Sequence, residues 1–390
     1  MYKKIINRIK NFKINPWREF KLWQKITSIL VGFILLSVAT MYGIARWYIA
    51  TQANTPLTLG TSFVPDYARY LGVDPKQTLG ALIDDMKVRD FRLTSFWSEG
   101  EPTQGHYDFS ELDWEFNMIN KVNGKVSLSI GLRQPRWPEC HVPEWAKNEP
   151  KSVWYPQLLN YMSAVIDRYK NNPALYNYEL ENEYFLKVFG TCTDFSRSRL
   201  IDEFNFVKEK DPYHEVVISR SNNAIGLPID KPTPDLFGVS VYKRVYDKTI
   251  THRYYEYPFP AWFYGFLAGG GEIIKGKNMI IHELQAEPWP PGALSTTSVE
   301  EQNKSMDAKR LASRFEYGEA TGIRTIYMWG AEWWYSRMVN NHDPSVWNVA
   351  KSEFQQNYEE NLKIEKKNMQ QSSSNQKTIQ LFANLSNNKL

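Results

Sequence analysis

Short apolar stretches recur at regular intervals along the chain between residues 58 and 329. Each stretch is rich in β-branched and aromatic residues and ends in polar or aromatic side chains, a pattern typical of strands. The pattern predicts eight strands, over residues 58–63, 91–96, 126–132, 175–182, 216–220, 237–242, 279–284 and 325–329.

Helical patterns separate the predicted strands. Leu79, Leu82 and Ile83 recur at helical spacing behind Asp74-Pro75, a pair typical of an N-cap and a first helical turn. Alternating strands and helices imply parallel βαβ units. Eight units over residues 56–350 match the size of a (β/α)8 barrel, the TIM barrel. A doubly wound open sheet is the alternative α/β fold, but no G-x-G-x-x-G follows the first strand.

The chain begins with a basic segment followed by an apolar run. Residues 1–25 hold eight Lys and Arg against one acid, and residues 26–45 contain no charge. Twenty such residues can span a bilayer as a helix, and the basic excess predicts a cytoplasmic N-terminus. We therefore predict a cytoplasmic segment at 1–25, a transmembrane signal anchor over 26–50 and an extracytoplasmic remainder. A cleaved signal peptide is the alternative.

The C-terminal end of the chain is polar, unlike the apolar run near the N-terminus. Residues 351–390 are rich in Lys, Glu, Gln, Asn and Ser, with little apolar content to bury. This composition predicts a polar, disordered tail behind the barrel domain.

Composition narrows the class of ligand. Hydrophobic residues make up 42% and charged residues 23% of the chain, which excludes a wholly disordered or multi-span membrane protein. Without residues 1–25, 39 basic residues face 42 acidic ones, so no nucleic-acid partner is expected. Fourteen Trp and 23 Tyr exceed the needs of a core and favour a sugar-like ligand.

The cysteines and histidines indicate a disulfide and no metal. Cys140 and Cys192 fall in the predicted exported part, where an isolated pair favours a disulfide over two free thiols. His282-Glu283 resembles the start of a zinc-protease motif, but residue 286 is alanine, so the second histidine is missing. We expect neither a metal nor a cofactor. Strand alternation predicts that His282 points away from the face that carries Glu283.

Acidic side chains follow two of the predicted strands. Strand four runs into Glu183, directly after its last residue, and strand seven carries Glu283 next to its last residue. Barrel enzymes build their active sites at the C-terminal ends of the strands, so both carboxylates should reach one mouth. A pair of carboxylates on opposite sides of a mouth is what glycoside cleavage requires. Glu287 competes as nucleophile, and Glu179 and Glu181 are interpreted as barrel-interior carboxylates, with Glu179 paired to a base such as Arg92.

These stretches resemble a known group of enzymes. Asn182-Glu183 after strand four and Glu283-Leu284-Gln285 after strand seven resemble glycoside hydrolase clan A. Residues 180–184 are similar to family 42 and family 35 β-galactosidases, and the layout also suits family 5 cellulase-like enzymes.

The resemblance implies a retaining mechanism with assigned roles. Glu183 would be the acid/base, and Glu283 the nucleophile that Arg92 and Tyr242 keep ionised. Asn182 would hydrogen-bond the sugar 2-hydroxyl. Trp329, on strand eight, would be the platform beneath the sugar.

Other tryptophans follow strands and are candidates for sugar stacking. Trp97 and Trp333 belong to this group, with loop packing as the alternative for each. The sequence as a whole predicts a membrane-anchored, extracytoplasmic glycosidase acting on an oligo- or polysaccharide with β-linkages. The alternatives are an inactive glycan-binding barrel and a transglycosidase of envelope polysaccharide.

Overall fold

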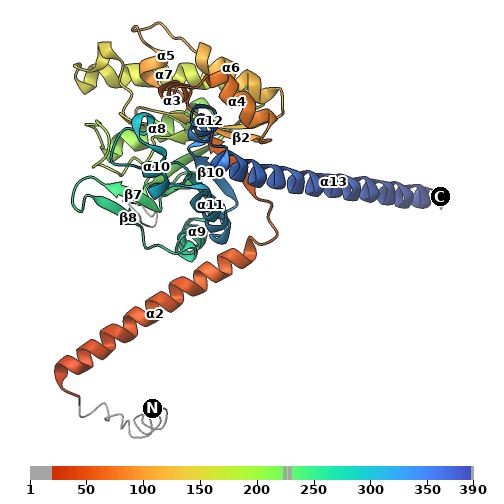
Figure 1. Cartoon of the computed structure of the whole chain (residues 1–390). Helices are drawn as coiled ribbons and strands as arrows, with labels where there is room; N and C mark the ends of the chain where they lie inside the picture. Colours follow the sequence, from red (N-terminus) through yellow and green to blue (C-terminus); the bar gives the residue numbers. More distant parts are fainter. Residues whose placement is uncertain (1–19, 223–225, 227–230, 388–390) are drawn as a thin grey trace.

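The computed structural model describes residues 20–222, 226 and 231–387 of the chain, with a closed parallel barrel at its centre (Figure 1). The barrel strands are β1 (Thr58–Ser62), β2 (Asp90–Thr94), β3 (Lys125–Ile130), β4 (Leu175–Leu180), β5 (Glu215–Arg220), β6 (Leu236–Val241), β9 (Met279–Gln285) and β10 (Thr325–Trp329). Each strand pairs with its successor, and β10 returns to pair with β1. The predicted barrel is therefore confirmed.

Helices surround the barrel, and the shortest of them belong to the loops at its mouth. They are α3 (Pro65–Tyr70), α4 (Pro75–Asp84), α5 (Trp97–Gly100), α6 (Ser110–Asn120), α7 (Lys151–Tyr169), α8 (Arg197–Lys210), α9 (Ala261–Lys275), α10 (Val299–Ser305), α11 (Ala308–Ala320) and α12 (Ala331–Asn340). Helix α4 begins as predicted, because the Asp74 carboxylate accepts a hydrogen bond from the Gln77 N–H at 2.8 Å.

Alternation along the strands sorts side chains between the pore and the helices. Phe91 and Leu93 are fully buried in the hydrophobic core, while Arg92 between them points into the pore. Ser127 and Asn177 likewise bond each other inside the barrel at 2.5 Å. The interior is thus a polar layer that leads up to the mouth.

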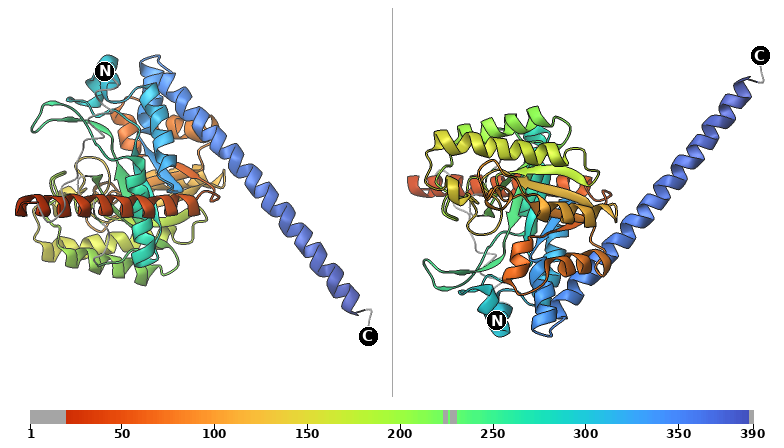
Figure 2. Two further views of the ribbon diagram at one scale, coloured as in Figure 1. Left: turned by 90° about the horizontal axis from the view of Figure 1, so that it is seen from below. Right: turned by 90° about the horizontal axis from the view of Figure 1, so that it is seen from above.

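A long apolar helix precedes the barrel. Helix α2 (Leu22–Thr51) is the one described helix that is long and apolar enough to cross a membrane. Its large apolar residues from Leu22 to Leu36 are exposed, whereas Ala45 and Tyr48 are buried against the barrel. In the left view of Figure 2 the helix crosses α9. The predicted cytoplasmic segment, residues 1–25, falls largely outside the described residues.

A hairpin that the sequence did not predict follows β6. Strands β7 (Arg244–Asp247) and β8 (Arg253–Glu256) pair in antiparallel fashion before α9 begins. The chain between β6 and β9 therefore forms first a hairpin and then α9, the helix that continues the barrel.

The residues after the barrel form a helix, and not the predicted disordered tail. Helix α13 (Ser345–Asn387) is 43 residues long and begins inside the predicted barrel domain. Trp347 and Phe354 are 2% exposed and pack on the core, and the Asn357 amide donates to the Leu57 carbonyl at 2.9 Å. The first turns thus belong to the barrel domain, because their apolar residues recur at helical spacing.

Candidate active site

The chain turns sharply where β4 ends. Glu181 and Glu183 have positive φ angles of 57° and 45°, which few residues other than glycine adopt. The turn is held by two bonds, from the Asn182 N–H to the Arg133 carbonyl at 2.7 Å and from the Glu183 N–H to Ser219 Oγ at 3.0 Å. Strained backbone at a strand end is typical of functional sites.

Ser240 lies between the two predicted catalytic glutamates. It is the register partner of Glu283 in the pairing of β6 with β9, and its hydroxyl donates to the Glu183 carboxylate. Burial raises the pKa of Glu183, and the charge of Glu283 raises it further. The structure thus brings Glu183 and Glu283 to one mouth.

Two donors contact Glu283. Arg92 Nη1 donates to one carboxylate oxygen at 2.8 Å, and the Tyr242 hydroxyl donates to the other at 2.6 Å. Burial and then the charge of Glu283 raise the pKa of Tyr242 well above its usual value, so the phenol keeps its proton. The two donors thus fix the Glu283 carboxylate at both of its oxygens.

Arg92 links the interior carboxylates. Its Nε donates to Glu179 and its Nη2 donates to Asn182 Oδ1 at 3.0 Å. Burial alone would raise the pKa of Glu179, but the charges of Arg92 and His282 outweigh it and hold that pKa well below its usual range. Glu179 is therefore an ionised structural partner, and Glu181 is similarly held by Arg199 at 3.0 Å.

A bulge in β9 corrects the predicted orientation of His282. Val239 and Ser240 of β6 pair with Ile281 and Glu283, so β9 contains one extra residue at this point. His282 consequently faces inward with Glu283, and its Nε2 lies 2.9 Å from Ser240 Oγ. Strict alternation could not predict this, because bulges leave little trace in a sequence.

A third carboxyl group, absent from the predicted site, lies beside the pair. Glu139, in the loop after β3, is 4% exposed and accepts a hydrogen bond from Asn182 Nδ2 at 3.2 Å. Burial raises its pKa well above the usual value, and the charges of Glu183 and Glu283 add to this despite nearby Arg133. Its nearness to the predicted disulfide was the one sequence signal that placed it at the mouth.

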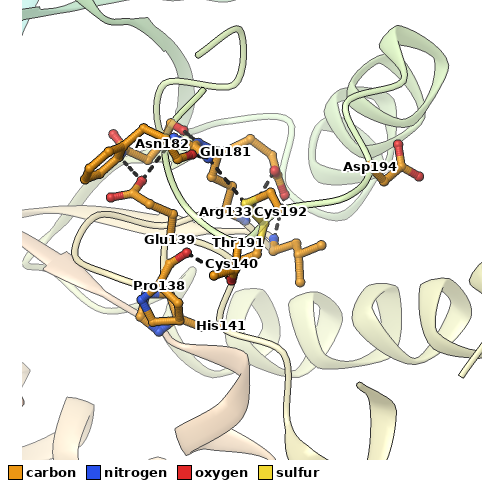
Figure 3. Close-up of a disulfide and its surroundings, with 12 residues drawn as sticks. Arg133, Pro138, Glu139, Cys140, His141, Glu181, Asn182, Thr191, Cys192 and Asp194 are labelled. Atoms are coloured by element: carbon orange, nitrogen blue, oxygen red, sulfur yellow. Dashed lines mark hydrogen bonds and ion pairs between the residues drawn. A yellow bond between two sulfur atoms is a disulfide. The ribbon is translucent and has the colours of Figure 1, made fainter. Parts of the chain in front are cut away.

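The predicted disulfide is present and ties two mouth loops together. Cys140 and Cys192 are bonded across a sequence separation of 52, with their Cα atoms 5.2 Å apart (Figure 3). Arg133 lies beside the bond and donates to the Phe189 carbonyl at 2.9 Å. The bond holds the loop that carries Glu139 against the loop that follows Glu183.

Glu287, the alternative nucleophile, is paired with an arginine. Arg136 donates to both oxygens of Glu287, at 2.6 and 3.3 Å, and its guanidinium carbon lies 4.0 Å from the Trp329 ring centroid. Trp329 is at the predicted strand end but is 3% exposed. Arg136 therefore covers the ring that the resemblance assigns to a sugar.

The other two predicted aromatic contacts are packed inside the mouth loops. Trp97 is fully buried, and its indole N–H donates to Glu101 at 2.6 Å. Trp333 is 2% exposed and donates to Gln302 at 2.8 Å. Loop packing, the alternative, describes both. Trp289 packs edge-on against Tyr242 with ring centroids 5.3 Å apart, and its indole nitrogen has no hydrogen-bond partner.

Over residues 20–222, 226 and 231–387, no three His, Cys, Asp or Glu side chains gather in an arrangement that could hold an ion.

Comparison with known proteins shows the fold alone. No family model and no curated protein sequence matches the chain. A family 42 β-galactosidase from G. stearothermophilus superposes with a TM-score of 0.51 at 13% identity, over 77% of this chain and 56% of that one. Xylanase 10B from Thermotoga maritima gives 0.50 at 13% identity, over 79% of this chain and 98% of that one.

A β-galactosidase from Halorubrum lacusprofundi gives a TM-score of 0.49 at 12% identity, over 70% of this chain. The chain spans 52% of the length of that protein. These similarities show that the chain has the eight-stranded barrel fold of clan A glycoside hydrolases.

Proposed function

We propose that this protein is a retaining glycoside hydrolase that cleaves β-linked saccharides. The observation that carries the proposal is the environment of the two glutamates. Glu283 receives hydrogen bonds from Arg92 and Tyr242, one to each carboxylate oxygen, which orient the carboxylate as a nucleophile. Burial raises the pKa of Glu183, which favours its protonated form. One ionised and one protonated carboxyl group are the requirements of a double displacement.

In the first step, Glu283 attacks the anomeric carbon while Glu183 gives its proton to the departing glycosidic oxygen. The bond from the anomeric carbon to that oxygen breaks, and a covalent ester to Glu283 forms. Glu183, now ionised, then takes a proton from water, whose oxygen displaces Glu283 and returns both residues to their starting forms.

Asn182 is suited to orient the sugar. Its Oδ1 accepts from Arg92 and one Nδ2 proton goes to Glu139, which leaves the second proton free. We assign this proton to the sugar 2-hydroxyl, a contact that strengthens as the ring gains positive charge.

We further propose that α2 anchors the enzyme and that the barrel lies outside the cell. The Cys140–Cys192 disulfide supports an oxidising compartment. Burial of Ala45 and Tyr48 supports retention of α2, because cleavage behind the helix would strip these residues from the barrel surface.

Replacement of the two glutamates tests the catalytic assignment. We expect Glu283→Gln and Glu183→Gln, in the detergent-solubilised full chain, to lower hydrolysis of activated aryl glycosides by about a thousandfold or more. Glu215→Gln, at an exposed position on the opposite rim, is the control and should retain full activity. Full activity in Glu283→Gln, or its loss only in Glu287→Gln, would eliminate Glu283 as the nucleophile.

A further inference from the structure

The last turns of α2 are fixed against the barrel. Ile44 and Tyr48 of this helix lie so close to Gly269 of α9 that a Cβ added there would meet both at 3.0 Å. Ile49 lies equally close to Gly322, at 2.8 Å from such a Cβ. Small residues thus let the two helices approach closely, and the direction in which α2 leaves the barrel is set by packing.

The N-terminal two thirds of α2, residues 22–41, are largely exposed and apolar, and Lys25 is their only charged residue. As a helix they span about 30 Å, the thickness of the hydrocarbon core of a bilayer. Tyr42, the next residue, packs edge-on against Trp262 of α9 with ring centroids 5.5 Å apart. The barrel surface therefore begins where the apolar stretch ends, with no linker between them.

The β7–β8 hairpin projects toward the same side of the barrel as the N-terminal half of α2 (Figures 1 and 2). The hairpin belongs to the mouth, because it follows the C-terminal end of β6. The Tyr246 N–H also donates to the Trp289 carbonyl of the β9 loop at 3.0 Å. The mouth and the apolar stretch of α2 consequently face one side.

The hairpin turn has the character of a membrane-contacting loop. Ile250 at its tip is 82% exposed, with the exposed basic residues Lys248 and Arg253 on either side. The Asp247 carboxylate accepts hydrogen bonds from the N–H groups of Thr249, Ile250 and Thr251, at 2.9, 3.1 and 2.7 Å. An apolar tip flanked by Lys248 and Arg253, with the Asp247 carboxylate taken up by the N–H groups of the turn, suits contact with lipid headgroups.

We propose that the barrel rests on the outer surface of the bilayer with its mouth toward the lipid, and that the turn at Ile250 contacts the headgroups. This inference rests on the proposed anchoring by α2 and is independent of the catalytic roles of the glutamates. It assigns the substrate to saccharides that are attached to a lipid or lie against a lipid surface.

A single-thiol label tests this arrangement in the full chain. The two native cysteines are bonded to each other, so Ile250→Cys and Tyr213→Cys each offer one free thiol. Tyr213 is the matched control, because it is 91% exposed and lies beside the start of β5, at the opposite rim. Each variant is labelled with an environment-sensitive dye and reconstituted in phosphatidylglycerol liposomes that carry a nitroxide on the headgroup.

We expect the label at position 250 to emit at shorter wavelength and to be quenched by the nitroxide lipid, and the label at 213 to respond to neither. Equal quenching at both positions would overturn the arrangement. So would a label at 250 that is shielded from both the lipid quencher and aqueous iodide, because a protein partner would then cover the turn. Failure of the chain to float with the liposomes would instead refute the anchoring.

An activity measurement separates this inference from the catalytic proposal. We expect Ile250→Asp to lower hydrolysis of a long-chain alkyl glycoside embedded in the liposomes, with the rate on a soluble aryl glycoside unchanged. Equal rates on the embedded glycoside would contradict the inference. An unmodified chain inactive on both substrates would contradict the catalytic proposal, and the quenching result would stand.

Discussion

At the scale of single residues, the hydrogen bond from Ser240 to the Glu183 carboxylate is central to the mouth. Ser240 donates to Glu183 and lies 2.9 Å from His282, so it favours the ionised form of the acid against burial. Its hydrogen bond lowers the pKa of Glu183 and so offsets part of the rise that burial causes. No sequence pattern marks this serine, because its role depends on the bulge in the neighbouring strand.

Removal of this donor should shift the pH dependence of the reaction. A general acid must be protonated, so activity falls as pH rises through the pKa of Glu183. Ser240→Ala removes a bond to the ionised form, which raises that pKa and moves the alkaline limb to higher pH. The measurement is kcat/KM against pH, with Ser336→Ala on α12 as the control. An unmoved alkaline limb would show that another group governs it.

Glu139 should make stability depend on pH. Its pKa is raised well above that of an exposed carboxyl, so the unfolded chain ionises first and stability falls as pH rises above about 4.5. Glu139→Gln mimics the protonated acid and should raise Tm at pH 8 while leaving it nearly unchanged at pH 4. Calorimetry at the two pH values checks this, and an equal shift at both would point to altered packing instead.

At the scale of elements, the close approach of α2 to α9 depends on glycines. Gly269→Leu places a large side chain against Ile44 and Tyr48, where even a Cβ is tight. Overpacking of this kind costs about 1–3 kcal/mol, and release of α2 would expose the apolar surface of α9. We expect a lower Tm and faster proteolysis between α2 and β1. Gly80→Ala, in the interior of α4, meets only a flexible Met118 at 3.7 Å; it is the control and should neither lower Tm nor speed this cleavage.

The strands were predicted closely because each is bounded by turn residues and buried on its outward face. Phe91 and Leu93 of β2, for example, mark both the strand and the inward direction of Arg92. The β7–β8 hairpin was missed because its residues are half-buried or exposed and show no alternation. Helix α13 was missed because polar residues between Trp347 and Phe354 concealed its apolar face.

The sequence could predict the candidate site to the extent that strand ends define it. Glu183, Glu283, Arg92, Asn182 and Tyr242 are brought together because each lies at or near the end of a barrel strand. The aromatic contacts were predicted less well, since residues in loops are placed by packing between loops. Glu139 reaches the site only through its loop and the adjacent disulfide, which strand positions do not specify.

At the scale of the whole molecule, the C-terminal turns of α2 and the barrel form one packed unit. A chain lacking residues 1–40 keeps the buried turns of α2, whereas one lacking residues 1–51 exposes the face of α9 that Ala45 and Tyr48 cover. We expect the first to be the more stable, with a higher Tm and less aggregation in the absence of detergent. Equal Tm values would show that the docked turns contribute nothing to the barrel.

The position of α2 directly before β1 has a mechanical consequence. β1 is the strand at which the ring closes, and it is bonded on both sides, to β2 and to β10. A pull transmitted through the anchor, as when a tethered polymer is dragged by flow, would first load the contact between α2 and α9. Only after that contact gave way would the force reach β1, where two ladders must shear together along their length.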